Sequence, residues 1–79
     1  MNKDEIYTRL QGIFDNVFME EVKISPELAA KDVEEWDSLT HVSLVLAIEE
    51  RFGLRFKVGE IESAKNVGDL VSLIALRAK

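Results

Sequence analysis

The chain has 79 residues, of which 47% are hydrophobic and 32% charged, a composition typical of a folded domain rather than a disordered segment. Its net charge of -5 argues against nucleic acid and anionic membranes as partners, because both attract a cationic surface. There is no cysteine, so neither disulfides nor cysteine-ligated zinc can contribute, and helix packing must stabilise this small core.

The sequence also lacks the signals of membrane insertion and secretion. No apolar run reaches the roughly 18 residues needed to cross a bilayer, and residues 1–10 lack the apolar segment of a signal peptide. We therefore expect a cytosolic, monomeric protein that forms a single domain over residues 1–79 and has no membrane partner.

The first predicted element is an amphipathic helix from about Lys3 to Phe18, capped by Asn2. Its apolar residues recur at helical spacing and should face the core: Ile6, Leu10, Ile13, Phe14 and Val17.

A long loop is predicted over residues 19–36, because Pro26 interrupts the helical period and Ser25 before it favours an extended backbone. A short helical turn can follow Pro26. Several apolar residues of the loop are expected to lie on the core: Val22, Ile24, Leu28, Val33 and Trp36. A connection this long in so small a domain usually has a functional reason.

The second helix is predicted from Ser38 or Leu39 to about Phe52, with Gly53 as its stop. At 100° per residue it carries two apolar stripes on nearly opposite sides. One stripe consists of Leu44, Val45, Ile48 and Phe52, and the other of Leu39, Val42 and Leu46, flanked by Ser43, Glu49 and Glu50. Only one stripe can face the core of a small bundle, so the other is left over.

The chain then turns at residues 53–55, and Phe56 and Val58 should anchor an extended connection. A short helix is predicted over residues 60–64.

The last helix is predicted at Val67–Arg77, with Asn66 as its cap and Asp69 completing a capping box. Its core face would comprise Val67, Leu70, Val71, Ile74 and Ala78. The predicted architecture is thus all-α: a small antiparallel helical bundle of three long helices plus one short helix, with a long loop between helices one and two.

Ser38 stands where the long loop gives way to the second helix. Backbone N–H groups and the dipole at a helix N-terminus favour a phosphate by roughly 0.3–1 kcal/mol, so a phosphodiester on this hydroxyl would be well placed. The simpler interpretation is an ordinary N-cap or first-turn serine.

Asp37-Ser38-Leu39, followed by an apolar-periodic helix that ends in Glu49-Glu50 and Phe52, is similar to the modification-site helix of acyl carrier proteins. The resemblance covers essentially the whole chain. It implies that a phosphopantetheinyl transferase attaches a 4′-phosphopantetheine arm from coenzyme A to Ser38. Acyl or aminoacyl intermediates would then ride on the arm's thiol as thioesters, which makes the protein a carrier and not an enzyme. Asp37 would position the transfer chemistry or cap the helix.

The resemblance also implies that the acidic second helix is the surface recognised by partner enzymes. Leu39, Val42 and Leu46, ringed by Glu49 and Glu50, would meet acyl- or aminoacyl-loading and processing enzymes that carry basic docking surfaces. The alternative is that these apolar residues form a second core face against the long loop.

His41 is the only histidine, three residues after Ser38. This spacing invites a hydrolase hypothesis, but no third group is evident to orient the imidazole. We expect instead a partly buried, hydrogen-bonded histidine, and an influence on cargo or arm contact stays an open hypothesis.

Three residues depart from the housekeeping fatty-acid carriers: Trp36, His41 and Ser43. They indicate a discrete carrier of a specialised pathway, such as polyketide extender-unit, aminoacyl or surface-polysaccharide assembly. Trp36 itself is expected to plug the core beneath the loop.

Two further interpretations carry less weight. The acidic residues near the second helix lack the pattern of a calcium loop, so we expect a solvated face and no metal site: Asp32, Glu34, Glu35 and Asp37. A competing function is a non-catalytic helical interaction domain in which Ser38 is only a helix cap.

Overall fold

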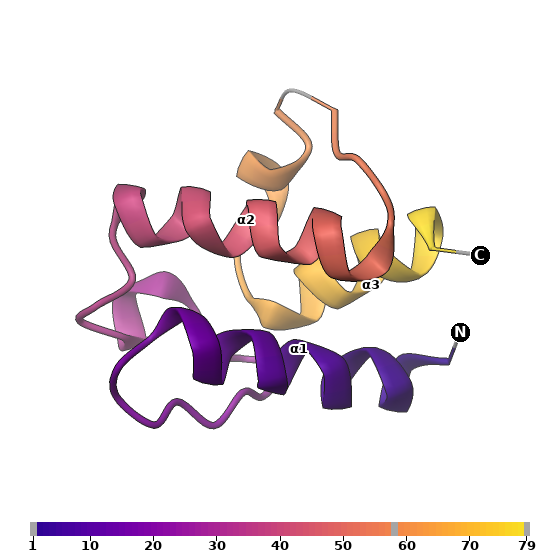
Figure 1. The fold of residues 1–79 in the computed structure, drawn as a ribbon. Helices are drawn as coiled ribbons and strands as arrows, with labels where there is room; N and C mark the ends of the chain where they lie inside the picture. The colour runs from indigo at the N-terminus through magenta and orange to yellow at the C-terminus, as the bar shows by residue number, and fades with distance from the viewer. Residues whose placement is uncertain (1, 58, 79) are drawn as a thin grey trace.

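The computed structural model describes residues 2–57 and 59–78 and contains three α-helices: α1 (Lys3–Val17), α2 (Ser38–Phe52) and α3 (Val67–Arg77). Two 3-10 turns, η1 (Ala30–Asp32) and η2 (Ile61–Ser63), lie in the connections. Figure 1 shows α2 running antiparallel to α1, and α1 contacts both α2 and α3. The described residues contain no strand, so the all-α prediction is confirmed for them.

The helix ends follow the predicted capping residues. Asn2 Oδ1 accepts a hydrogen bond from the Glu5 N–H at 2.8 Å, and Asn66 Oδ1 accepts one from the Asp69 N–H at 2.8 Å. Gly53 ends α2 in the left-handed conformation, with φ 63°, which a residue without Cβ adopts at little cost. The capping box predicted for Asp69 is displaced by one residue, because its carboxylate accepts from the Lys65 N–H rather than from the cap.

The predicted fourth helix is shorter than expected. Only Ile61–Ser63 are helical, in a single 3-10 turn closed by a hydrogen bond from the Ala64 N–H to the Ile61 carbonyl at 3.0 Å. Gly59 precedes it with φ 87°, and the chain becomes extended again at Ala64, so there is no room for an α-helical turn. The described residues therefore form three α-helices, and the predicted fourth helix is only the η2 turn. Val58, the other predicted anchor, lies outside the described residues.

The hydrophobic core lies between the three helices and beneath the long loop. The predicted core residues of α1 and α3 are buried except Val17 and Ala78, which are half-buried. On α2, Leu44 and Ile48 are fully buried while Val45 and Phe52 are half-buried. The buried residues are Ile6, Leu10, Ile13, Phe14, Phe18, Val22, Val33, Leu44, Ile48, Leu54, Val67, Leu70, Val71 and Ile74.

The long loop lies on the core, as its apolar residues predicted, and polar groups hold it there. The Gln11 side chain forms hydrogen bonds with the loop backbone at two residues. Its Nε2 donates to the Val22 carbonyl at 2.6 Å, and its Oε1 accepts from the Ile24 N–H at 3.0 Å. Loop carbonyls also receive the first N–H groups of α3, since Val67 donates to Leu28 and Gly68 to Pro26. A turn follows Pro26, but the 3-10 helix begins only at Ala30.

Gly68 is the glycine that the loop requires. A Cβ at this position would lie 3.0 Å from the Pro26 carbonyl oxygen, whereas a Cβ at Gly12 in α1 would meet nothing within 4 Å. Alanine ordinarily stabilises a helix interior by about 0.5–1 kcal/mol over glycine.

We therefore expect Gly12→Ala to raise the free energy of unfolding by about 0.5–1 kcal/mol and Gly68→Ala to lower it, in urea titrations followed by circular dichroism. An equal rise in the free energy of unfolding for both substitutions would show that the contact between Pro26 and Gly68 does not disfavour a Cβ at position 68.

None of the helices in the described part of the chain is long and apolar enough to cross a membrane.

Candidate functional site

The N-terminus of α2 is fixed by a reciprocal pair of hydrogen bonds between Asp37 and Thr40. Asp37 is the N-cap, and its Oδ1 accepts from the N–H groups of Leu39 and Thr40, both at 3.0 Å. In return the Thr40 hydroxyl oxygen accepts from the Asp37 N–H at 2.8 Å and lies 2.6 Å from the Glu35 carbonyl, to which it donates. Thr40 was missed at the sequence level, although an Asp followed by Thr three residues later approximates the capping-box pattern.

This arrangement keeps Asp37 ionised. The backbone N–H of Thr40 contributes most to lowering the pKa of the Asp37 carboxyl, and the Thr40 hydroxyl and the Leu39 N–H act in the same direction against the effect of desolvation. Because the folded-state pKa is depressed, the cap is fully present at neutral pH and is lost as the pH falls through that lowered value.

Ser38 is the first residue of α2 and is exposed. The N-cap is Asp37, so of the two simpler interpretations of Ser38 the structure excludes the N-cap and supports the first-turn serine. Within the described residues the Ser38 hydroxyl makes no hydrogen bond, while the aspartate before it satisfies the first-turn donors. The hydroxyl is therefore free to meet a reagent brought by another molecule, at the positive end of a 15-residue helix.

His41 forms a hydrogen bond with Trp36 and not with Ser38. The indole Nε1–H of Trp36 donates to His41 Nδ1 at 3.0 Å, and the two rings stack with their planes 21° apart. The predicted half-buried, hydrogen-bonded histidine is confirmed, and no carboxylate of the described chain forms a hydrogen bond to orient it for nucleophilic catalysis.

Trp36 also closes the core beneath the loop, as predicted. Its ring centroid lies 5.4 Å from that of Phe14, at an edge-to-face angle of 86°, and 6.0 Å from that of Phe18. Edge-to-face aromatic pairs at such distances contribute about 0.5–1.5 kcal/mol beyond the area they bury. One end of the indole is thus fixed by the core and the other by His41.

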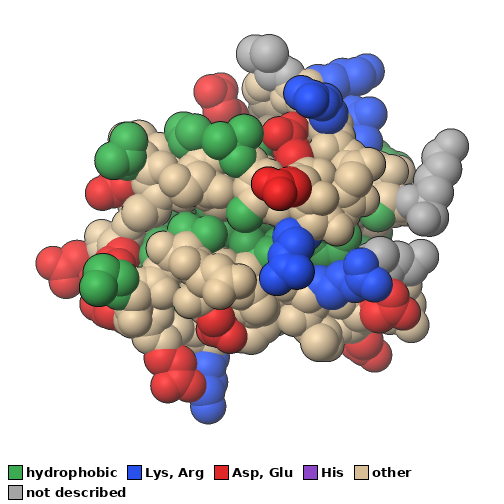
Figure 2. Space-filling view, viewed as in Figure 1, with side chains coloured by type: hydrophobic (Ala, Val, Ile, Leu, Met, Phe, Trp, Pro, Cys, Tyr) green, Lys and Arg blue, Asp and Glu red, His purple; other side chains and the backbone are tan. Residues whose placement is uncertain are grey.

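The second stripe of α2 is exposed. Leu39, Val42 and Leu46 expose 79%, 56% and 59% of their surface, so the alternative of a second core face is wrong. Hydrophobic side chains gather along the outer side of α2 in Figure 2. The structure thus leaves an exposed apolar stripe along α2.

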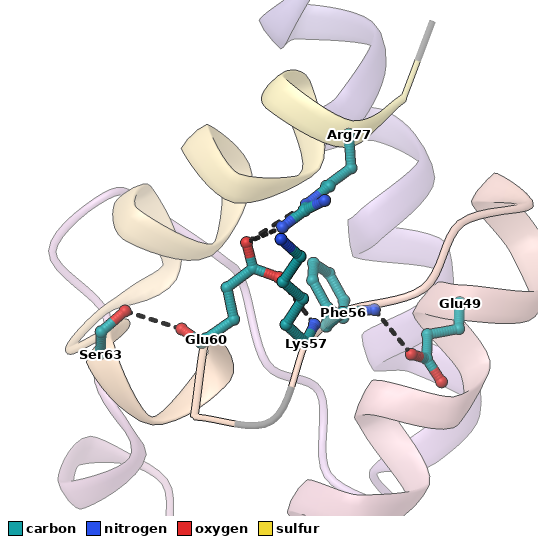
Figure 3. Close-up of polar contacts among 6 residues, drawn as sticks. All are labelled: Glu49, Phe56, Lys57, Glu60, Ser63 and Arg77. Carbon is teal, nitrogen blue, oxygen red and sulfur yellow. Dashed lines mark hydrogen bonds and ion pairs between the residues drawn. The ribbon is translucent and has the colours of Figure 1, made fainter.

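The two glutamates predicted beside this stripe differ. Glu50 is exposed, whereas Glu49 is half-buried and its Oε2 accepts a hydrogen bond from the Phe56 N–H at 2.9 Å (Figure 3). Glu49 therefore holds the connection after α2 in place.

An ion pair fixes the far end of that connection. Glu60 pairs with Arg77 of α3 and also accepts from the Lys57 N–H at 2.8 Å, as Figure 3 shows. The Arg77 guanidinium is the main cause that lowers the pKa of the Glu60 carboxyl.

Two of the acidic residues before α2, Asp32 and Glu35, accept hydrogen bonds from the loop backbone. Glu35 accepts from the N–H groups of Met19 and Glu20, at 3.2 and 2.8 Å, and Asp32 accepts from the Ala29 N–H at 3.0 Å. The expectation of a merely solvated face is incomplete, because these carboxylates tie the loop together. No group of three potential metal ligands occurs among the described residues.

Comparison with known proteins identifies the class first. Residues 32–74 match the family model for a phosphopantetheine attachment site, and these residues include the N-terminus of α2 with its exposed serine. Most of the chain therefore belongs to a domain built to carry this cofactor.

Several proteins of similar sequence or structure are acyl carrier proteins. The chain is 38% identical over 76 residues to an acyl carrier protein of Acidothermus cellulolyticus, covering 95% of this chain and 90% of that protein. It is 33% identical over 75 residues to one of Thermosynechococcus vestitus, covering 94% and 93%. The solution structure of holo acyl carrier protein from Geobacter metallireducens is similar, with a TM-score of 0.75 and 31% identity over 95% of this chain and 83% of that one.

The chain belongs to the acyl carrier protein family, and its cofactor is a covalently attached 4′-phosphopantetheine. The site fits this group, because an exposed, unengaged hydroxyl stands at a helix N-terminus beside an open hollow of about 400 Å³. Membership of the family implies interaction with a phosphopantetheinyl transferase and with biosynthetic enzymes.

Proposed function

We propose that Ser38 is the residue that bears the arm, and that the protein shuttles thioester-linked acyl or aminoacyl groups among enzymes without catalysing their reactions. The observation that carries this proposal is the free hydroxyl of Ser38 in the first turn of α2, inside the matched attachment region. When bound, the arm supplies a thiol that holds the cargo.

Loading joins Ser38 Oγ to the phosphorus of the pantetheine phosphate of coenzyme A, and adenosine 3′,5′-bisphosphate leaves. The hydroxyl proton passes to a base of the transferase, because no base of the described chain is hydrogen-bonded to Ser38. Asp37 acts as the cap that fixes Ser38 in the helix, through its bonds to the Leu39 and Thr40 N–H groups.

Partner enzymes would dock on Leu39, Val42 and Leu46, with Glu50 and the outer part of Glu49 drawing basic surfaces toward the exposed stripe. The exposure of all three apolar residues supports this proposal. A small apolar stripe flanked by carboxylates is suited to short-lived complexes with partner enzymes. In such complexes the charges raise the association rate more than the affinity.

A specialised pathway, rather than housekeeping fatty-acid synthesis, is proposed from the Trp36–His41 pair. The pair places a large stacked element directly beside Ser38. The arm and its cargo would therefore contact the stacked rings of Trp36 and His41.

The attachment site is tested by intact-mass spectrometry after incubation with coenzyme A and a broad-specificity phosphopantetheinyl transferase. The wild-type protein is expected to gain the mass of one phosphopantetheine, and Ser38→Ala to gain none. Ser43→Ala, which removes an exposed serine of the same helix, is the matched control and should load fully. Modification that persists in Ser38→Ala would place the arm elsewhere, and an unmodified wild-type chain would favour the plain interaction domain.

A further inference from the structure

Two hollows meet at the Trp36–His41 pair. The outer one measures about 400 Å³ and lies at the surface beside the attachment serine; its lining residues are Ala30, Trp36, Asp37, Ser38, His41 and Val42. The second, here called the inner hollow, measures about 60 Å³ and shares Ala30, Trp36 and His41 with the first. Its other lining residues are Ile61, Ala64, Lys65, Asn66 and Leu70, of which Leu70 is buried and Lys65 is exposed. The stacked pair thus forms a wall that both hollows share, between the side that faces Ser38 and the side that faces the η2 turn and the start of α3.

The wall is held in place from both sides. His41 accepts the indole N–H at 3.0 Å, and Phe14 and Phe18 of the core contact the indole ring from behind. Opening it would break the hydrogen bond and uncover part of the core, because Phe14 and Phe18 are both buried.

The sizes of the two hollows decide what can enter. A cavity of about 150 Å³ accommodates a benzene ring, so the 60 Å³ of the inner hollow is too small for six carbon atoms. The outer hollow falls within the range of about 300–1,000 Å³ that is usual for small-ligand sites. The outer hollow is therefore large enough for a cargo of this size, whereas the inner hollow is not.

We propose that the Trp36–His41 pair keeps tethered cargo out of the helical bundle and that this carrier accordingly serves short acyl or aminoacyl groups, of fewer than about six carbon atoms. The inference rests on the proposed function, since the cargo is tethered through Ser38. A charged amine on an aminoacyl cargo agrees with it, because such a group is costly to bury in an apolar interior.

The test loads the full chain with acetyl-, butyryl-, hexanoyl- or octanoyl-phosphopantetheine from the matching coenzyme A thioesters, with intact mass confirming each product. Failure to load any of them refutes the proposed function rather than the wall. For the loaded forms, the melting temperature and the NMR signals of Ile61 and Leu70 are compared across chain lengths.

The wild-type forms are expected to melt within about 1 °C of one another, with unchanged Ile61 and Leu70 signals. Trp36→Ala should open the wall, so its octanoyl form should melt about 4 °C or more above its acetyl form, because a ligand that binds only the folded state stabilises it. His41→Ala keeps the indole in the core and should show a smaller rise of the same sign, which preserves the test if Trp36→Ala does not fold.

Leu76→Ala, an exposed position on α3 that lines neither hollow, is the control and should behave like the wild type. The proposal is overturned if the wild-type octanoyl form is stabilised and shifts the Leu70 signal. It is equally overturned if the folded variants show no dependence on chain length.

Discussion

Leu44→Ala is expected to lower the free energy of unfolding by about 2–5 kcal/mol, whereas Leu46→Ala, two residues further along α2, should change it by less than about 0.5 kcal/mol. Leu44 is fully buried between the helices, and truncating it leaves a cavity that rigid neighbours fill only in part. Leu46 exposes 59% of its surface, so its loss removes little buried area. Urea titrations at pH 7 measure both values.

The same two variants separate stability from recognition. Leu46→Ala is expected to raise the KM for the transferase several-fold with little change in kcat, because truncating a docking contact removes up to about 1–2 kcal/mol of binding. Leu44→Ala, assayed well below its melting temperature, should load with a nearly normal KM. Normal kinetics in Leu46→Ala would place the docking surface off this stripe.

Asp37→Ala is expected to reduce kcat/KM for loading by up to about 100-fold, since a displacement of the reacting group by 1 Å can cost that much. The aspartate holds the Leu39 and Thr40 N–H groups, and without it the first turn that carries Ser38 frays. Transferase kinetics at pH 7, with circular dichroism to confirm the fold, measure the effect.

Asp37→Asn is the matched control, because asparagine caps helices about as well as aspartate but carries no charge. Near-normal loading of Asp37→Asn would assign Asp37 the role of a cap. Loading as poor as that of Asp37→Ala would instead show that the carboxylate charge takes part in the encounter with the transferase. These outcomes separate the two roles that the sequence left open for Asp37.

Local rules explain why so much of the fold could be predicted. Asn2, Gly53 and Asn66 act through hydrogen bonds or dihedral angles that involve residues close in sequence. The ends of the helices could therefore be predicted from the sequence. The division of α2 into buried and exposed stripes likewise follows from helical periodicity alone. The exposed position of Leu39 needed no knowledge of its neighbours in space.

The features that the sequence could not show depend on contacts between distant segments. Glu49 was expected on the docking rim, yet it bonds to the backbone seven residues later because of the path that the connection takes. Trp36 was expected in the core and His41 to be hydrogen-bonded, but only the folded loop brings the indole N–H to the imidazole. The helix predicted over residues 60–64 is limited to one turn by Gly59, with its positive φ, on one side and by the extended Ala64 on the other.

The bonds from Val67 and Gly68 to the loop carbonyls of Leu28 and Pro26 couple parts of the chain that are some forty residues apart. The amide protons that begin α3 are protected from solvent exchange only while the loop is in place, so their exchange rates report on the loop as well as on the helix. Binding at the N-terminus of α2, where the loop ends, can in this way alter the opening of a helix that it does not touch. Hydrogen exchange of the Val67 and Gly68 amides would therefore report whether loading disturbs the loop.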